Sequence, residues 1–181
     1  IALKNSITHH CQVSQKPTTG IDSPVSAFFL DIFVVNQHTP PWKESPIVGM
    51  DYALKQPIEK SLKTLLVMSP FEDPVPLKRA WCIYEICNTK RLGASLDISM
   101  PEEEHTRFIE ALTLGEFDFN DWITNIDIEQ AGAFDPNDKT MIMELVSKSP
   151  GSAPGLNRTV VMALCEWLSV QGYLALERIP H

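Results

Sequence analysis

The hydrophobic pattern of the chain alternates between short apolar runs and longer segments with helical spacing. The strongest run, AFFLDIFVV at residues 27–35, is almost wholly apolar and rich in Phe, Ile and Val. Such a composition is typical of a central strand that is covered on both faces. Shorter apolar runs at residues 65–68 and 96–100 predict two further strands.

Apolar residues recur three or four positions apart in the segments that separate these strands. Residues 47–62 show this spacing, although Pro57 is expected to break or kink a helix there. A second helix is predicted from Leu77 to about Arg91. Pro101 and the three glutamates that follow it suit the first turn of a third helix, because acidic side chains favour the positive end of the helix dipole.

The two ends of the chain are less regular. Residues 1–26 are polar and interrupted by Pro and Gly, and we predict an irregular amino-terminal segment. Residues 122–128 alternate apolar and polar side chains, which predicts a fourth strand at the edge of the sheet. Asp135 and Pro136 look like the N-cap and first residue of a helix, and Asn157 is expected to cap the last helix.

Strands that alternate with helices predict an α/β fold, specifically a three-layer sandwich with a mainly parallel central sheet, as in flavodoxin. The 181 residues, 44% of them hydrophobic, suffice for one domain with its own core, which we expect to span residues 27–179.

The net charge of −8 argues against nucleic-acid binding, because a protein that holds a phosphate backbone carries a basic patch. We expect no membrane span, since no run approaches the roughly 20 apolar residues required.

The four cysteines are interpreted as reduced core thiols, which predicts an intracellular, cytoplasmic location. Cys82 and Cys87 are a poor match to zinc spacing. His9 and His10 stand beside Cys11 without a second ligand cluster nearby, so no metal site is predicted.

Polar residues interrupt or follow the strongest apolar run. Asp31 lies within it, and the sequence Asn-Gln-His that ends at His38 comes directly after it. Open parallel sheets bind ligands at the carboxyl ends of their strands, so these side chains are candidates for a site. The alternative, which is equally favoured, is that they only cap the strand and fix the following loop.

Glu85 is the second candidate. It lies four residues after Trp81, so the two side chains share a face of the predicted helix. The alternative interpretation is an ion pair on a solvated helix face with Lys78, Lys90 or Arg91.

Three segments, FFLDIFVVNQH, LLVMSP and PVPLKRAWCIYEI, together resemble the TIR-like domains (Toll/interleukin-receptor fold) of large algal, oomycete and protist proteins. The motifs that carry the resemblance are DIFxVNQH and PLxRAWCxxEI, and the similarity covers approximately residues 27–100. The segment WCIYE, Trp81 to Glu85, is similar to the part of TIR domains that holds the catalytic glutamate of NAD-cleaving members.

The resemblance implies glycohydrolase chemistry with NAD as substrate. Glu85 would be the catalytic carboxylate, which stabilises the oxocarbenium-like ribose as the bond to nicotinamide breaks. By position alone, Trp81 or Trp42 would stack on a base, and Asp31, His38 or Arg79 would line the pocket. These tryptophans are also well suited to plain core packing.

Two departures from the family pattern favour a different activity. Residues 1–26 contain no recognisable version of the first helix and ligand-binding loop of active TIR domains, and no general acid is evident beside Glu85. Many TIR domains act by self-association or adaptor binding. We therefore predict a non-catalytic TIR-like assembly module, in a signalling protein or as a subunit of a larger complex. We expect it to contact other protein chains or to self-associate, and to require no cofactor. The alternative is an NAD-cleaving enzyme that uses Glu85.

Overall fold

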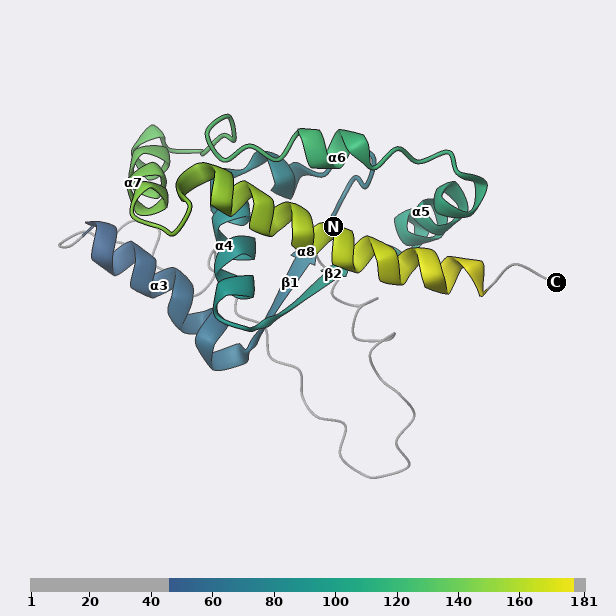
Figure 1. Cartoon of the computed structure of the whole chain (residues 1–181), viewed down its shortest axis with the longest axis horizontal. Coiled ribbons are helices and arrows are strands. Elements are labelled where there is room, and N and C mark those ends of the chain that lie inside the picture. The colour runs from purple at the N-terminus through teal and green to yellow at the C-terminus, as the bar shows by residue number, and fades with distance from the viewer. Residues whose placement is uncertain (1–45, 178–181) are drawn as a thin grey trace, which may run out of the picture.

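The computed structural model of the chain describes residues 46–177 (Figure 1). The predicted irregular segment 1–26 and the predicted strand 27–35 lie outside these residues. In chain order the described elements are α3 (Pro46–Ser61), β1 (Lys63–Val67), the 3-10 helix η1 (Val75–Lys78), α4 (Ala80–Arg91), β2 (Ser95–Ser99), α5 (Glu102–Leu114), α6 (Asn120–Thr124), α7 (Pro136–Ser147) and α8 (Ser152–Leu176).

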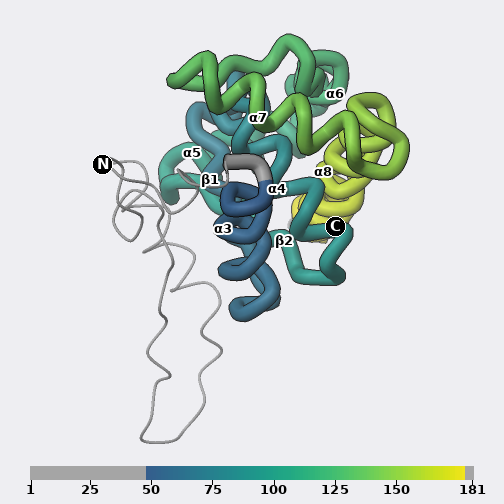
Figure 2. Tube along the Cα trace, turned by 90° about the vertical axis from the view of Figure 1, so that its left-hand side faces the viewer, coloured from purple at the N-terminus to yellow at the C-terminus, as the bar shows by residue number. Residues whose placement is uncertain are grey.

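The two described strands pair in parallel, with Lys63 opposite Ser95 and Val67 opposite Ser99. Both strands predicted from the apolar runs within the described residues are therefore confirmed, as is the α/β class. Helix α4 connects the two strands, which gives a β-α-β unit. Helix α3 lies beside α4, and the two are joined by a hydrogen bond of 2.8 Å from the hydroxyl of Tyr84 to Oδ1 of Asp51 (Figure 2).

Pro57 does not break the first helix, because α3 continues through it to Ser61. Proline removes one backbone hydrogen bond from a helix interior. The burial of Met50 and Ile58 on either side of it holds α3 against the rest of the core and offsets that loss.

The first residues of three helices can be compared with the predictions. The segment expected to be helical from Leu77 begins instead as η1, and α4 starts at Ala80 after the extended residue Arg79. Pro101 precedes α5 as its N-cap residue and is not its first helical residue. The predicted cap of α7 is confirmed, since the carboxylate of Asp135 accepts a hydrogen bond of 2.8 Å from the amide of Asn137.

Helix α8 begins at Ser152, so the prediction that Asn157 caps it is wrong. The side chain of Asn157 instead accepts a hydrogen bond of 3.1 Å from the amide of Ile128, in the loop before α7. By length and composition α8 is long and apolar enough to cross a membrane. In this structure Leu156, Val160 and Leu164 are fully buried, although only 28% of the most apolar stretch of α8 is buried.

An aromatic cluster joins α5, α6 and α8 to the loop after β1. Phe108, on α5, is its centre, and four other rings have their centroids within 5.4 to 6.1 Å of it: Phe71, Phe117, Trp122 and Trp167. Because these rings come from segments far apart in the sequence, the cluster fixes the carboxyl-terminal half of the domain against the loop that follows β1.

The predicted edge strand at residues 122–128 is wrong. The chain forms the short helix α6 there, followed by an irregular turn. Trp122 is only 2% exposed, and its indole Nε1 donates a hydrogen bond of 2.8 Å to the backbone oxygen of Phe71. Ile126 and Ile128 are also buried, so the alternating apolar residues reach the core without a sheet.

Candidate functional site

The candidate site is built on the loop and helix that follow β1, because this segment carries Glu85 and Trp81. Both oxygens of one carboxylate hold the first part of the loop. Oε1 of Glu104, in the first turn of α5, accepts a hydrogen bond of 2.7 Å from the hydroxyl of Ser69. Its Oε2 accepts one of 3.2 Å from the amide of Phe71. The carboxyl end of β1 is thus tied to the helix that follows β2.

The start of α4 is fixed by the loop before α7. The amide of Gly132 donates to the backbone oxygen of Lys78 at 2.9 Å, and the oxygen of Gly132 accepts from the amide of Ala80 at 2.9 Å. Arg79 lies between these two bonds in extended conformation, with an exposed side chain. The structure therefore places Arg79 directly before α4, six residues from Glu85.

Glu85 lies on α4, one turn after Trp81, and its side chain is partly buried. Its backbone oxygen accepts a hydrogen bond of 2.8 Å from the hydroxyl of Thr89, which in turn is 2.7 Å from the hydroxyl of Thr64 on β1. This chain of hydroxyls connects the helix to the sheet directly behind Glu85.

The three cations considered as ion-pair partners of Glu85 each interact with another group. Lys78 pairs with Asp73 at 2.6 Å, and Lys90 pairs with Glu166 of α8 at 2.8 Å. The guanidinium of Arg91 donates a hydrogen bond of 2.9 Å to the backbone oxygen of Pro150. These contacts join α4 to its surroundings.

Trp81 connects α4 to α7. Its indole Nε1 donates a hydrogen bond of 3.1 Å to Oδ2 of Asp138, and its ring packs against the hydrophobic core. This contact gives Trp81 a structural role, which was the alternative to base stacking. Asp31, His38 and Trp42, the other residues predicted to line a pocket, lie outside the described residues.

A polar network that the sequence analysis missed lies between α3 and α4. Tyr84 is 2% exposed and donates its hydroxyl proton to Asp51, whose other carboxylate oxygen is 2.7 Å from Nζ of Lys55. Burial raises the pKa of Tyr84 far above its ordinary value, and the hydrogen bond to Asp51 raises it further. The available sequence signal was the pair Asp51 and Lys55, four residues apart in a predicted helix.

Asn88 extends this network into the core. Its side chain is 3% exposed, and within the described part of the chain its Nδ2 makes no hydrogen bond. An unsatisfied buried amide is unfavourable by about 1–3 kcal/mol.

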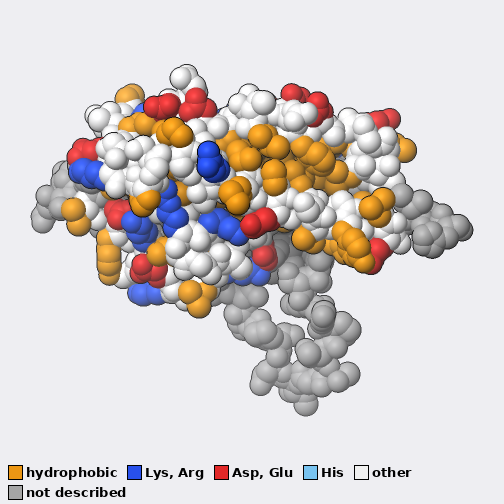
Figure 3. Space-filling model, viewed as in Figure 1, with side chains coloured by type: hydrophobic (Ala, Val, Ile, Leu, Met, Phe, Trp, Pro, Cys, Tyr) orange, Lys and Arg blue, Asp and Glu red, His pale blue; other side chains and the backbone are white. Residues whose placement is uncertain are grey.

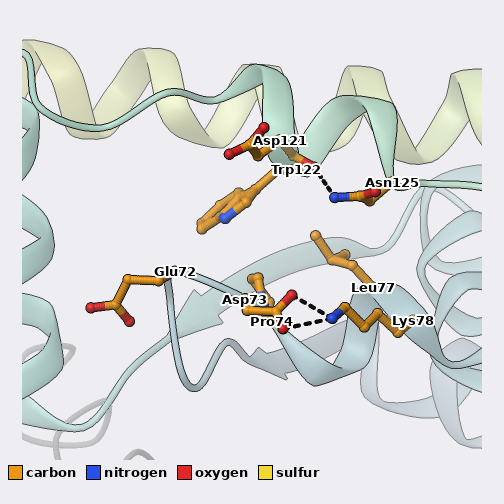
Figure 4. A pocket seen from close by; sticks show the side chains of 8 residues that line it. All are labelled: Glu72, Asp73, Pro74, Leu77, Lys78, Asp121, Trp122 and Asn125. Carbon is orange, nitrogen blue, oxygen red and sulfur yellow. Dashed lines mark hydrogen bonds and ion pairs between the residues drawn. The ribbon is translucent and has the colours of Figure 1, made fainter.

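A small hollow opens between α6 and the segment that leads into α4 (Figure 4). Its volume is about 20 Å³, enough for a single water molecule and far too small for a nucleotide. The hollow is lined by Glu72, Asp73, Pro74, Leu77, Lys78, Asp121, Trp122 and Asn125. Figure 4 shows the ion pair between Lys78 and Asp73 at its lower side.

Among residues 46–177 there is no group of three or more His, Cys, Asp or Glu side chains that could hold a metal ion. Cys82, Cys87 and Cys165 are thiols in the structure. Burial raises the pKa of the Cys87 thiol, which disfavours its reactive thiolate form. The candidate metal ligands His9, His10 and Cys11 lie outside the described residues.

Comparisons of the chain with protein-family models, with curated proteins and with solved structures found no match.

Proposed function

We propose that the chain is a non-catalytic TIR-like module whose function is to assemble with other protein chains. The observation that carries this proposal is a group of exposed apolar side chains on α8, here called the α8 stripe. It consists of Met162, Val170, Tyr173, Leu174 and Leu176, which are 42 to 65% exposed. Hydrophobic side chains gather over α8 and between α8 and α6 in Figure 3.

Five of the eleven large hydrophobic side chains that are exposed among residues 46–177 lie on this one helix. Exposed apolar residues that gather in one place often mark a site where another molecule binds, whereas single scattered ones do not. Around Glu85, by contrast, hydrogen bonds join α4 to β1 and to α7.

The proposal includes a three-layer TIR-like sandwich in which residues 27–35 form a third parallel strand. Helix α3 would connect that strand to β1, as α4 connects β1 to β2. Connections between parallel strands are right-handed. Two consecutive connecting helices therefore lie on the same face of a sheet only when each new strand is added on the same side of the one before it. Because Asp51 of α3 contacts Tyr84 of α4, the added strand belongs on the edge of β1 opposite β2.

Amide hydrogen exchange tests this placement. If residues 27–35 pair with β1, the amides that bond to β1 should exchange slowly, at rates comparable to those of the β1 amides, because both would open only with the core. Rapid exchange throughout residues 27–35 in the folded chain would contradict the three-layer arrangement.

The experiment that tests assembly compares the wild-type chain with a Val170→Glu, Leu176→Glu variant. Both chains are cross-linked in an extract of the source cells, and the covalent products are identified by mass spectrometry. We expect the wild-type products to be lost in the variant, because two buried charges would be unfavourable at an apolar interface. Equal yields of every product from both chains would overturn the proposed function.

A second candidate function, cleavage of NAD, is favoured by the partial exposure of Glu85, which lies one turn after Trp81 in the helix that follows β1. In this reaction the carboxylate would stabilise positive charge on the ribose while the bond to nicotinamide breaks and water completes the hydrolysis.

Release of nicotinamide from NAD by the concentrated chain decides between the two functions. The assembly proposal expects no release. The enzymatic candidate expects release that falls at least a hundredfold in Glu85→Gln and is unchanged in Glu110→Gln, an exposed control on α5. Release that persists in Glu85→Gln would place the chemistry at another residue.

A further inference from the structure

The exposed face of α8 combines apolar side chains with carboxylates. Glu166, Val170, Tyr173 and Glu177 recur at intervals of four, three and four residues, so they form one row along the helix, here called the 166–177 row. All four side chains are exposed, and those of Val170 and Tyr173 are 56% and 64% exposed. The row therefore has an apolar centre with a carboxylate at each end.

The surroundings of the row are acidic. Residues 108–138 and 159–177, which include the end of α5, all of α6 and most of α8, contain ten Asp and Glu residues and no Lys or Arg. The next basic residue, Arg178, lies outside the described residues. Among the described residues, Nζ of Lys90 on α4 contacts Oε2 of Glu166 at 2.8 Å, but the side chain of Glu166 remains 63% exposed.

The distribution of charge over the surface agrees with this sequence pattern. In the right-hand part of Figure 3, which holds α5 and the end of α8, the described side chains on view include Asp and Glu but no Lys or Arg. The field around the exposed apolar residues of α8 is therefore negative and attracts a positively charged partner.

The order of charges along the row disfavours a second copy of this chain as the partner. A second α8 in parallel orientation would place each carboxylate against its own counterpart. In antiparallel orientation, Glu166 of one copy would lie opposite Glu177 of the other when the apolar centres meet. Like charges face each other in both orientations, which is unfavourable. An anionic lipid surface would meet the same repulsion.

A basic amphipathic helix fits both features of the row. Its apolar residues would pack against Val170 and Tyr173, because a straight helix presents a ridge on which another helix packs. A Lys or Arg on either side of them, eleven residues apart like Glu166 and Glu177, would pair with the two carboxylates. Eleven residues span about 17 Å in any α-helix, so the two spacings match.

We propose that α8 binds a basic amphipathic helix of a different protein through the 166–177 row, with a cation of the partner against each carboxylate. This inference rests on the proposed assembly function and names the chemistry of its partner.

Two synthetic peptide helices of identical composition test this partner. The matched peptide carries central leucines and, on the same side, two lysines eleven residues apart, whereas the scrambled peptide carries the lysines at the centre and the leucines at both ends. Fluorescence anisotropy of each labelled peptide is measured against the full chain. The matched peptide should bind at least tenfold more tightly, because general attraction to a net charge of −8 is the same for both. Equal affinities would overturn the inference.

A reversal of charge locates the contact. Glu177→Lys should weaken binding of the matched peptide at least tenfold and strengthen binding of a peptide with glutamates in place of its lysines. Glu59→Lys is the matched control, since Glu59 is an exposed glutamate on α3 and the net charge changes equally. Circular dichroism should show that both variants keep the wild-type fold. Equal effects of the two variants would show that net charge alone acts, and would overturn the inference.

Further outcomes separate this inference from the function on which it rests. Equal binding of both peptides, together with cross-linked products that depend on the α8 stripe, would overturn the basic helix as partner and leave the assembly function standing. A dimer of this chain that is seen in sedimentation and lost in Val170→Glu would do the same and name a second copy. Cross-linked products that do not depend on the stripe at all would overturn the assembly function and this inference with it.

Discussion

Replacement of Phe108 by alanine should lower the free energy of unfolding by about 3–5 kcal/mol. Phe108 is fully buried, and its ring lies against four others. Its removal takes away apolar contacts and leaves a cavity between α5, α8 and the loop after β1. The loss is large because rings on three separate segments cannot all move inward to fill the space.

Urea unfolding followed by circular dichroism measures this change, with the slope of the transition as a check that the unfolded state is unaltered. Phe134→Ala is the control, because it deletes the same ring at a position that is 99% exposed. It should change the free energy of unfolding by less than about 0.5 kcal/mol. A loss below about 1 kcal/mol for Phe108→Ala would show that the aromatic cluster is not part of the stable core.

At alkaline pH the chain should lose stability through Tyr84. The pKa of this phenol is raised above its ordinary value of 10.0 in the folded state, mainly by burial and also by its hydrogen bond to Asp51. The folded state therefore holds the proton more tightly than the unfolded state. Its stabilising contribution is complete below pH 10.0 and decreases as the pH rises toward the folded pKa, by about 1.4 kcal/mol per pH unit.

The variant Tyr84→Phe isolates this effect. At neutral pH it should be less stable than wild type by about 1 kcal/mol, because one hydrogen bond to Asp51 is lost. Above pH 10.0 the difference should shrink and then reverse, since phenylalanine cannot ionise. Unfolding curves at pH 7 and at half-unit steps above pH 9 test this, and a constant difference between the two chains would contradict it.

Two other groups titrate in this range and have to be separated from Tyr84. The pKa of Cys87 is raised from 9.0, chiefly by burial. Its contribution to stability therefore also decreases with rising pH, but the decrease begins near pH 9.0 and not near pH 10.0. The pKa of Lys139 is lowered from 10.5, chiefly by desolvation, so its contribution increases with pH up to about 10.5. Both groups remain in Tyr84→Phe and cancel in the comparison.

The candidate site was only partly predictable from the sequence. The spacing of Trp81 and Glu85 placed them on one helix face, which the structure shows. The contact of Trp81 with Asp138 joins residues 57 positions apart, and no local pattern indicates such a pair. For the same reason, the sequence did not reveal that the hydroxyl of Tyr84 on α4 donates a hydrogen bond to the carboxylate of Asp51 on α3.

The sequence by itself determined those elements that depend on a few neighbouring residues. Two apolar runs became β1 and β2, and the Asp-Pro pair at 135–136 became the cap of α7, because strand burial and capping act over a few residues. Tertiary structure decided the segment 122–128, which has the alternation of a strand. There the indole of Trp122 reaches the backbone of Phe71, and packing of Ile126 and Ile128 into the core outweighs strand propensity.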